Sequence, residues 1–67
     1  MELQWDDVRI LLEIYESGSM NKASRRLKVS QPTLSRKVAE LEYMLGEALF
    51  IRNNQGVSLT NTGKRLL

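Results

Sequence analysis

The side chains best suited to chemistry lie in one short segment, residues 29–36, which reads Val-Ser-Gln-Pro-Thr-Leu-Ser-Arg. Ser30 can cap a helix, and Pro32 suits the first helical turn because its missing N–H is not needed there. Apolar residues then recur at helical spacing, at Leu34, Val38, Leu41 and Leu45. The opposite face holds small, hydrogen-bonding and cationic residues, namely Pro32, Ser35, Arg36 and Ala39. The spacing therefore predicts a helix whose outward face could lie in a DNA groove.

Residue types needed for enzymatic and metal chemistry are scarce. The sequence has no histidine and no cysteine, so it offers no imidazole for acid–base catalysis, no thiolate ligand for zinc and no disulfide. The acids Glu40, Glu42 and Glu47 have no histidine, cysteine or glycine-rich phosphate loop beside them. We therefore expect no catalytic residue, no metal site and no cofactor, and an enzyme is the weakest interpretation.

Charge is distributed unevenly along the chain, although the net charge is only +2. Residues 1–16 and 40–47 are mainly acidic, whereas residues 17–39 contain no acid. The bases of this middle block are Lys22, Arg25, Arg26, Lys28, Arg36 and Lys37. Clustered cations often form a solvated face, but here they coincide with the segment described above. That coincidence favours phosphate binding, which requires clustered cations.

Length and hydropathy limit what the chain can form. Its 67 residues suffice for one small domain, which buries only about 60% of its unfolded surface. No apolar run approaches the roughly 18 residues of a membrane span. The N-terminus lacks the basic start and apolar stretch of a secretion signal. We expect a soluble, cytoplasmic domain without a membrane partner.

Local signals predict two helices before the central segment. Asp6 or Asp7 can cap a first helix, and Gly18 can end it in a left-handed conformation. Ser19 can then cap a short second helix directly. Lys28 lies in the turn that follows, where we expect an uncommon backbone conformation that glycine adopts more easily.

The pattern changes after the third helix, predicted over about residues 31–45 and ended by Gly46. Apolar residues then alternate in two short stretches on either side of residues 53–56, Asn-Asn-Gln-Gly, which favour a turn. This indicates a β-hairpin, and Thr60 or Asn61 can cap a fourth helix beyond it.

Three helices followed by a hairpin make a mainly α winged helix-turn-helix, which we expect over residues 1–59. Residues 60–67 are expected to begin a fourth helix that is cut short, because its terminal leucines have nothing to cover them, and we expect the chain to be one domain of a longer protein. The predicted core consists of Leu11, Ile14, Ala23, Leu27, Leu34, Val38, Leu41, Met44, Leu45, Phe50 and Ile51.

The motifs resemble a known family, the LysR-type bacterial transcriptional regulators. The stretch Ser-Gln-Pro-Thr-Leu-Ser-Arg at residues 30–36 is followed at the right distance by Leu49-Phe50 with Arg52. Other matching positions are Gly18-Ser19, Ala23 with Leu27, Leu41-Glu42, Leu45-Gly46, Gly56-Val57, Leu59-Thr60 and Thr62-Gly63. The sequence departs from the family at Met20, usually aromatic, at Asn21, usually a small hydroxyl residue, and at Gln55, often arginine.

The resemblance implies a domain that binds double-stranded DNA at interrupted palindromes as part of a homodimer or higher oligomer. In the family a longer fourth helix pairs the subunits, and a separate C-terminal domain senses a small-molecule inducer. The family's recognition helix corresponds here to residues 31–45, with Gln31, Pro32, Ser35 and Arg36 as its DNA-facing residues.

The full set of predicted DNA-binding residues is Ser19, Asn21, Lys22, Ser30, Gln31, Pro32, Thr33, Ser35, Arg36 and Arg52. Arg36 can pair with guanine or with phosphate, and the ring of Pro32 can pack on a thymine methyl group. Ser35 and Gln31 either contact base edges or only cap and space the helix. The residues that begin the second helix suit a phosphate, because free backbone N–H groups lie there.

Two alternatives remain open at this point. Arg52 either contacts phosphate or the minor groove, or forms an ion pair with Glu42 or Glu47. The whole domain could instead be a winged-helix protein-interaction module that does not bind DNA. Such modules usually lose the cationic outward face of the third helix, and this sequence keeps it.

Overall fold

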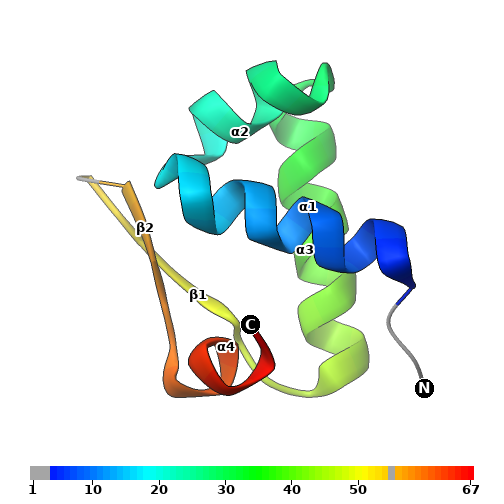
Figure 1. The fold of residues 1–67 in the computed structure, drawn as a ribbon, viewed down its shortest axis with the longest axis vertical. Coiled ribbons are helices and arrows are strands. Elements are labelled where there is room, and N and C mark those ends of the chain that lie inside the picture. Colours follow the sequence, from blue (N-terminus) through cyan, green and yellow to red (C-terminus); the bar gives the residue numbers. More distant parts are fainter. Residues whose placement is uncertain (1–3, 55) are drawn as a thin grey trace.

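The structure, a computed structural model, describes residues 4–54 and 56–67. The elements follow in the order α1 (Trp5–Ser17), α2 (Met20–Leu27), α3 (Gln31–Leu45), β1 (Phe50–Asn53), β2 (Gly56–Leu59) and α4 (Asn61–Leu66). The two strands form one antiparallel hairpin in which Phe50 pairs with Leu59 and Arg52 with Val57. The predicted winged helix-turn-helix is therefore confirmed (Figure 1).

Three helices begin at the hydroxyl residues that the sequence favours. The side-chain oxygens of Ser19, Ser30 and Thr60 each accept the backbone N–H three residues further on, at 3.0, 3.2 and 3.0 Å. Each bond satisfies a donor that has no partner within its own helix. These caps fix where α2, α3 and α4 start.

The start of α1 differs from the prediction. Its N-cap is Gln4, and neither Asp6 nor Asp7 occupies that position. Asp7 lies in the first turn instead, where its carboxylate accepts the backbone N–H of Gln4 at 3.1 Å and pairs with Lys37 of α3 at 3.2 Å. An acid in the first turn also interacts favourably with the helix dipole. The carboxylate thus stabilises the helix from within its first turn and joins it to α3.

The first three helices each end at a residue in the left-handed backbone conformation. Gly18 and Gly46 have φ values of 75° and 77°, as predicted for glycine after a helix. Lys28, at the end of α2, has φ 60° and is the one non-glycine residue with positive φ in the described parts of the chain. The uncommon conformation predicted for the turn is confirmed.

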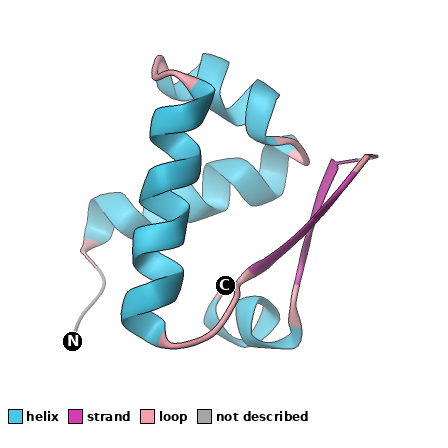
Figure 2. Cartoon of the chain, turned by 180° about the vertical axis from the view of Figure 1, so that it is seen from behind, coloured by secondary structure: helices cyan, strands magenta, loops and turns pink. Residues whose placement is uncertain are grey.

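The core lies where α1 crosses α3 and α2 packs on both (Figure 2). Its buried hydrophobic residues are Leu11, Ile14, Met20, Ala23, Leu34, Val38, Leu41, Leu49 and Phe50, with Leu27 and Leu45 packed against them. Two predicted core residues are exposed, Met44 at 47% and Ile51 at 51%. Ile51 follows the buried Phe50 along β1, and adjacent strand residues point to opposite faces. Met44 lies beside the buried stripe of α3 rather than on it.

The hairpin extends away from the helices, and the turn between α1 and α2 contacts it (Figure 1). The backbone N–H of Val57 donates to the carbonyl of Gly18 at 3.0 Å. A Cβ atom on Gly56 would lie 2.3 Å from that carbonyl oxygen, so this close approach requires glycine. Gln55, within the predicted turn, lies outside the described residues. Over the described ranges, no helix has the length and hydrophobicity needed to cross a membrane.

Candidate nucleic-acid interface

The N-terminal half of α3 presents polar groups on the face opposite the core. Leu34 and Val38 are buried at 2% and 0% exposure, whereas Gln31, Pro32 and Arg36 are exposed. The cap of Ser30 and the proline in the first turn place the helix start so that these side chains point outward. The outward face combines an amide, an apolar ring and a guanidinium, which are groups that can contact base edges.

Ser30 and Thr33 interact with each other at the start of α3. The hydroxyl of Ser30 donates to Oγ1 of Thr33 at 2.7 Å while it caps the backbone N–H of the same residue at 3.2 Å. A serine hydroxyl has one proton to donate, so Ser30 has no donor left for a phosphate. Thr33 keeps its own hydroxyl proton and is exposed, and it is the better phosphate donor of the two.

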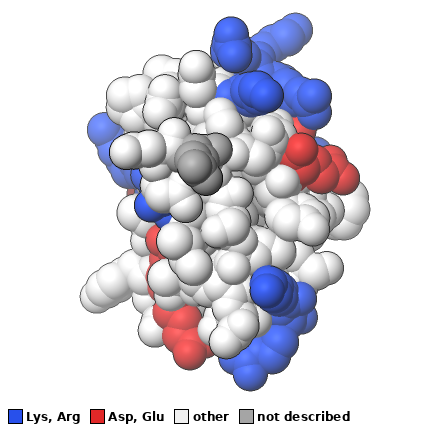
Figure 3. Space-filling view, turned by 90° about the vertical axis from the view of Figure 1, so that its left-hand side faces the viewer, with Lys and Arg blue, Asp and Glu red and all other residues white. Residues whose placement is uncertain are grey.

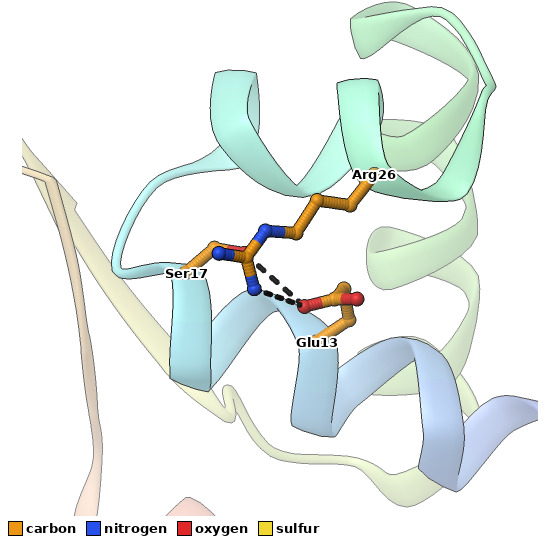
Figure 4. Close-up of polar contacts among 3 residues, drawn as sticks. All are labelled: Glu13, Ser17 and Arg26. Atoms are coloured by element: carbon orange, nitrogen blue, oxygen red, sulfur yellow. Dashed lines mark hydrogen bonds and ion pairs between the residues drawn. The ribbon is translucent and has the colours of Figure 1, made fainter.

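The cations of the middle block divide into paired and unpaired groups. Arg26 pairs with Glu13 of α1 at 3.3 Å, and Lys37 pairs with Asp7 of α1 at 3.2 Å. Glu13 also accepts the hydroxyl of Ser17 at 3.3 Å (Figure 4). Among the cations of residues 17–39, those that are exposed and have no ion pair are Lys22, Arg25, Lys28 and Arg36. These four remain available to an external anion.

The surface view shows where positive charge gathers. Lys and Arg cover the end of the molecule formed by α2 and the turn into α3, and a second group lies at the end that holds α4 (Figure 3). The second group corresponds to the last turn of α4, which contains Lys64 and Arg65. The face between these groups is largely white in this view, with acidic patches just below the upper group and at the lower left. A polyanion crossing this face would therefore meet cations at both ends.

A polar cleft of about 390 Å³ lies between the starts of α2 and α3 and the hairpin. Its lining residues are Ser19, Met20, Asn21, Gln31, Arg52, Asn53, Asn54, Gly56 and Val57. The cleft brings together four predicted site residues from the starts of α2 and α3 and from β1. These residues are Ser19, Asn21, Gln31 and Arg52. The other predicted residues (Lys22, Ser30, Pro32, Thr33, Ser35 and Arg36) do not line it.

Arg52 joins the hairpin to α3. Its Nη1 donates to the hydroxyl of Ser35 at 3.2 Å. The alternative ion pair is wrong, because no described ion pair joins Arg52 to Glu42 or Glu47. Glu42 accepts backbone N–H groups at the start of β1, and Glu47 accepts the hydroxyl of Thr62 at 2.9 Å.

Two features of this surface were missed by sequence reasoning. Asn53 and Asn54 line the cleft, but in the sequence they were interpreted only as turn formers. Glu42 holds the start of the hairpin through the backbone N–H groups of Leu49 and Phe50, whereas the sequence suggested only Arg52 as its partner. An acid in the last turn of a helix opposes the helix dipole, and that mismatch was the available signal.

Comparison with known proteins agrees with this geometry. The family described as "Bacterial regulatory helix-turn-helix protein, lysR family" matches residues 5–64. The Small neutral protease regulatory protein of Streptomyces coelicolor is 42% identical over 67 residues, which are 100% of this chain and 20% of that protein. The regulator IlvY of Escherichia coli is 40% identical over 60 residues, 90% of this chain and 20% of that protein.

Solved structures agree as well. The crystal structure of the CbnR DNA-binding domain in complex with DNA superposes with a TM-score of 0.89 at 34% identity, covering 97% of this chain and 75% of that one. This chain spans about a fifth of the length of the curated relatives that it matches. Those relatives are described as regulators rather than as enzymes. With the family match extending over residues 5–64, the chain belongs to the lysR family of bacterial regulatory helix-turn-helix proteins.

Proposed function

We propose that this chain binds double-stranded DNA sequence-specifically, with α3 in the major groove, as the N-terminal domain of a bacterial transcriptional regulator. The observation that supports this most directly is the exposed face of α3, where Gln31, Pro32 and Arg36 point away from a buried apolar stripe. The similar CbnR domain was solved in complex with DNA. A helix fits the major groove, where each base pair presents a distinct pattern of donors and acceptors.

The proposed contacts divide into base reading and backbone positioning. Arg36 and Gln31 read base edges, and Pro32 packs on a thymine methyl group. Ser19, Asn21 and Lys22 place the start of α2 against a phosphate, because the exposed N–H groups and the lysine favour an anion there. Thr33 donates its free hydroxyl proton to a phosphate of the DNA backbone. Ser30 makes no such contact and acts by holding the first turn of α3.

The alternative function, a protein-interaction module without DNA binding, has less support. It would give no role to the exposed cations Lys22, Arg25, Lys28 and Arg36, which have no ion pair. The sequence has no histidine or cysteine, and we propose no enzymatic role.

Titration with duplex DNA at two salt concentrations separates these functions. DNA binding through several phosphates requires affinity to fall steeply as salt rises, because counterions are released on binding. Replacing Arg36 with Ala should weaken binding to the preferred site by about 1–3 kcal/mol and relax preference at one base pair. Replacing Lys22 with Ala should weaken binding to all duplexes alike and reduce the salt slope by about one unit.

Two outcomes would contradict the assignment. Equal losses for the Arg36 variant on every sequence would make Arg36 a phosphate contact rather than a base reader. Weak binding that does not respond to salt, in the unaltered chain, would favour the protein-interaction module.

For a longer protein that contains this domain, we propose an assembly of at least two copies. Residues 1–59 would form the DNA-binding unit, and residues 60–67 would begin the helix that links it to the rest of the protein and pairs the subunits. Two α3 helices about 34 Å apart, or a multiple of that distance, would then read an interrupted palindrome. We further propose that the longer protein has a C-terminal domain that binds a small-molecule inducer. We expect this protein to be cytoplasmic. Sedimentation of the longer protein with and without DNA tests the assembly.

A further inference from the structure

The base of the hairpin is held by a single carboxylate oxygen. Oε2 of Glu42, near the end of α3, accepts the backbone N–H of Leu49 at 2.7 Å and that of Phe50 at 3.2 Å. A charged acceptor makes such bonds stronger than a neutral one does. The first residues of β1 are therefore fixed relative to α3.

The other strand is fixed to a different part of the molecule. The N–H of Val57 donates to the carbonyl of Gly18 at 3.0 Å, in the turn that leads into α2. With one strand attached to α3 and the other to the α1–α2 turn, the backbone beside Arg52 has a defined place. Arg52 pairs with Val57 in the strand register, so it lies directly opposite the second attachment.

The side chain of Arg52 is held by a residue of α3. Its Nη1 donates to the hydroxyl of Ser35 at 3.2 Å. Ser35 is half-buried, whereas Arg52 is exposed. Arg52 also lines the polar cleft. A guanidinium has five N–H donors, so the bond to Ser35 leaves other donors for an external anion. An arginine that is already oriented loses less rotamer freedom on binding.

We propose that Ser35 is a positioning residue, whose hydroxyl holds the guanidinium of Arg52 beside the N-terminal half of α3. Helix and hairpin then present their donors to the DNA backbone as one preformed surface. The proposal rests on the DNA-binding function proposed above. It assigns Ser35 an action through Arg52, because its hydroxyl oxygen accepts a guanidinium N–H of that side chain.

A double-mutant cycle tests this assignment on duplex DNA selected from a random pool. Replacing Ser35 with Ala should lower affinity about threefold to tenfold, the loss typical of one hydrogen bond, and on all duplexes alike. The same replacement should have no further effect in a chain that already has Arg52→Ala. Ser35→Thr keeps the hydroxyl and should bind with the affinity of the unaltered chain. Ser58→Ala, on the exposed face of β2, is the matched control and should change nothing.

A measurement without DNA keeps the test independent of the proposed function. In the free chain, the NMR signal of the Arg52 Nε–H should show slowed guanidinium rotation, and Ser35→Ala should shift it and speed the rotation while core amide signals stay in place. An unchanged Arg52 signal in that variant overturns the positioning role. Additive losses in the cycle, or a Ser35→Ala loss confined to one base pair, also overturn it. Failure of the unaltered chain to bind any DNA, with the Arg52 signal behaving as expected, would instead contradict only the DNA-binding function.

Discussion

The helix-turn-helix and the hairpin are held in place by different kinds of interaction. Around α1, α2 and α3, side chains such as Leu11, Ile14 and Val38 are fully buried, and packing of apolar surface holds the helices. Among the described residues of the two strands, only Phe50 is buried, and hydrogen bonds to Glu42 and Gly18 contribute much to the placement of the hairpin. Burial is non-directional, whereas a hydrogen bond fixes a particular geometry.

This difference has a consequence for function. The stability of the domain should depend mainly on the helical core, and the orientation of the hairpin should depend on a few polar contacts. Substitutions in the hairpin contacts should therefore change how DNA is held without unfolding the domain. The following substitutions test that separation, from the largest expected effect to the smallest.

Replacing Leu34 with Ala should have the largest effect. Leu34 is 2% exposed in the centre of the core, and such a replacement removes apolar contacts and leaves a cavity. We expect a loss of about 2–5 kcal/mol in the free energy of unfolding, measured by denaturant titration. Ile51→Ala is the control, because Ile51 is 51% exposed and should change stability little. Equal losses for both variants would mean that the hairpin contributes to stability as much as the helical core does.

Replacing Gly56 with Ala should disturb the hairpin more than the core. Gly56 has φ 134°, and the added Cβ would lie 2.3 Å from the carbonyl oxygen of Gly18. Strain of this kind costs about 1–3 kcal/mol, and we expect it to be relieved by movement of β2. Hydrogen exchange should speed up in the hairpin and stay unchanged in α1 and α3.

Gly46→Ala is the matched control for that experiment. Gly46 also has a positive φ, 77°, but a Cβ there would meet nothing within 4 Å. The Gly46→Ala variant should lose stability through backbone strain alone, and hydrogen exchange in the hairpin should not change. If both variants give the same exchange pattern, the contact between Gly56 and Gly18 does not position β2.

Replacing Glu42 with Ala should release the base of the hairpin. The backbone N–H groups of Leu49 and Phe50 would lose their acceptor, and unsatisfied donors of this kind cost about 1–3 kcal/mol. Faster hydrogen exchange at these two amides is the direct measurement. Glu42→Gln keeps an oxygen acceptor and should retain part of their protection. Full protection in the Ala variant would show that strand pairing alone holds β1.

The elements of this fold were predictable because their signals are local. A serine followed by a helical pattern predicted the starts of α2 and α3, and glycine predicted the ends of α1 and α3. The period of two after Gly46 predicted the hairpin. Even the strained conformation of Lys28 followed from its place in a tight turn.

Contacts between distant residues were not predictable in the same way. The bond from Arg52 to Ser35 spans 17 positions, and the sequence instead suggested Glu42 or Glu47 as partners because opposite charges attract. Ile51 was placed in the core because it is apolar, although its neighbour Phe50 already occupied the inward direction of the strand. Which side chains meet depends on how α3 and the hairpin are oriented, and no local pattern contains that orientation.

Replacing Arg26 with Ala should have the smallest effect. Arg26 pairs with Glu13 at 3.3 Å, but their side chains are 62% and 24% exposed, and exposed ion pairs contribute only about 0–1 kcal/mol because water and salt screen them. Arg25→Ala is the control, since Arg25 is exposed and has no described ion pair. The two variants should differ by less than about 1 kcal/mol in the free energy of unfolding at low salt and should converge as salt rises. A difference of several kcal/mol that persists at high salt would show that a polar contact, and not apolar packing alone, holds α2 on α1, and the contrast between helical core and hairpin would no longer stand.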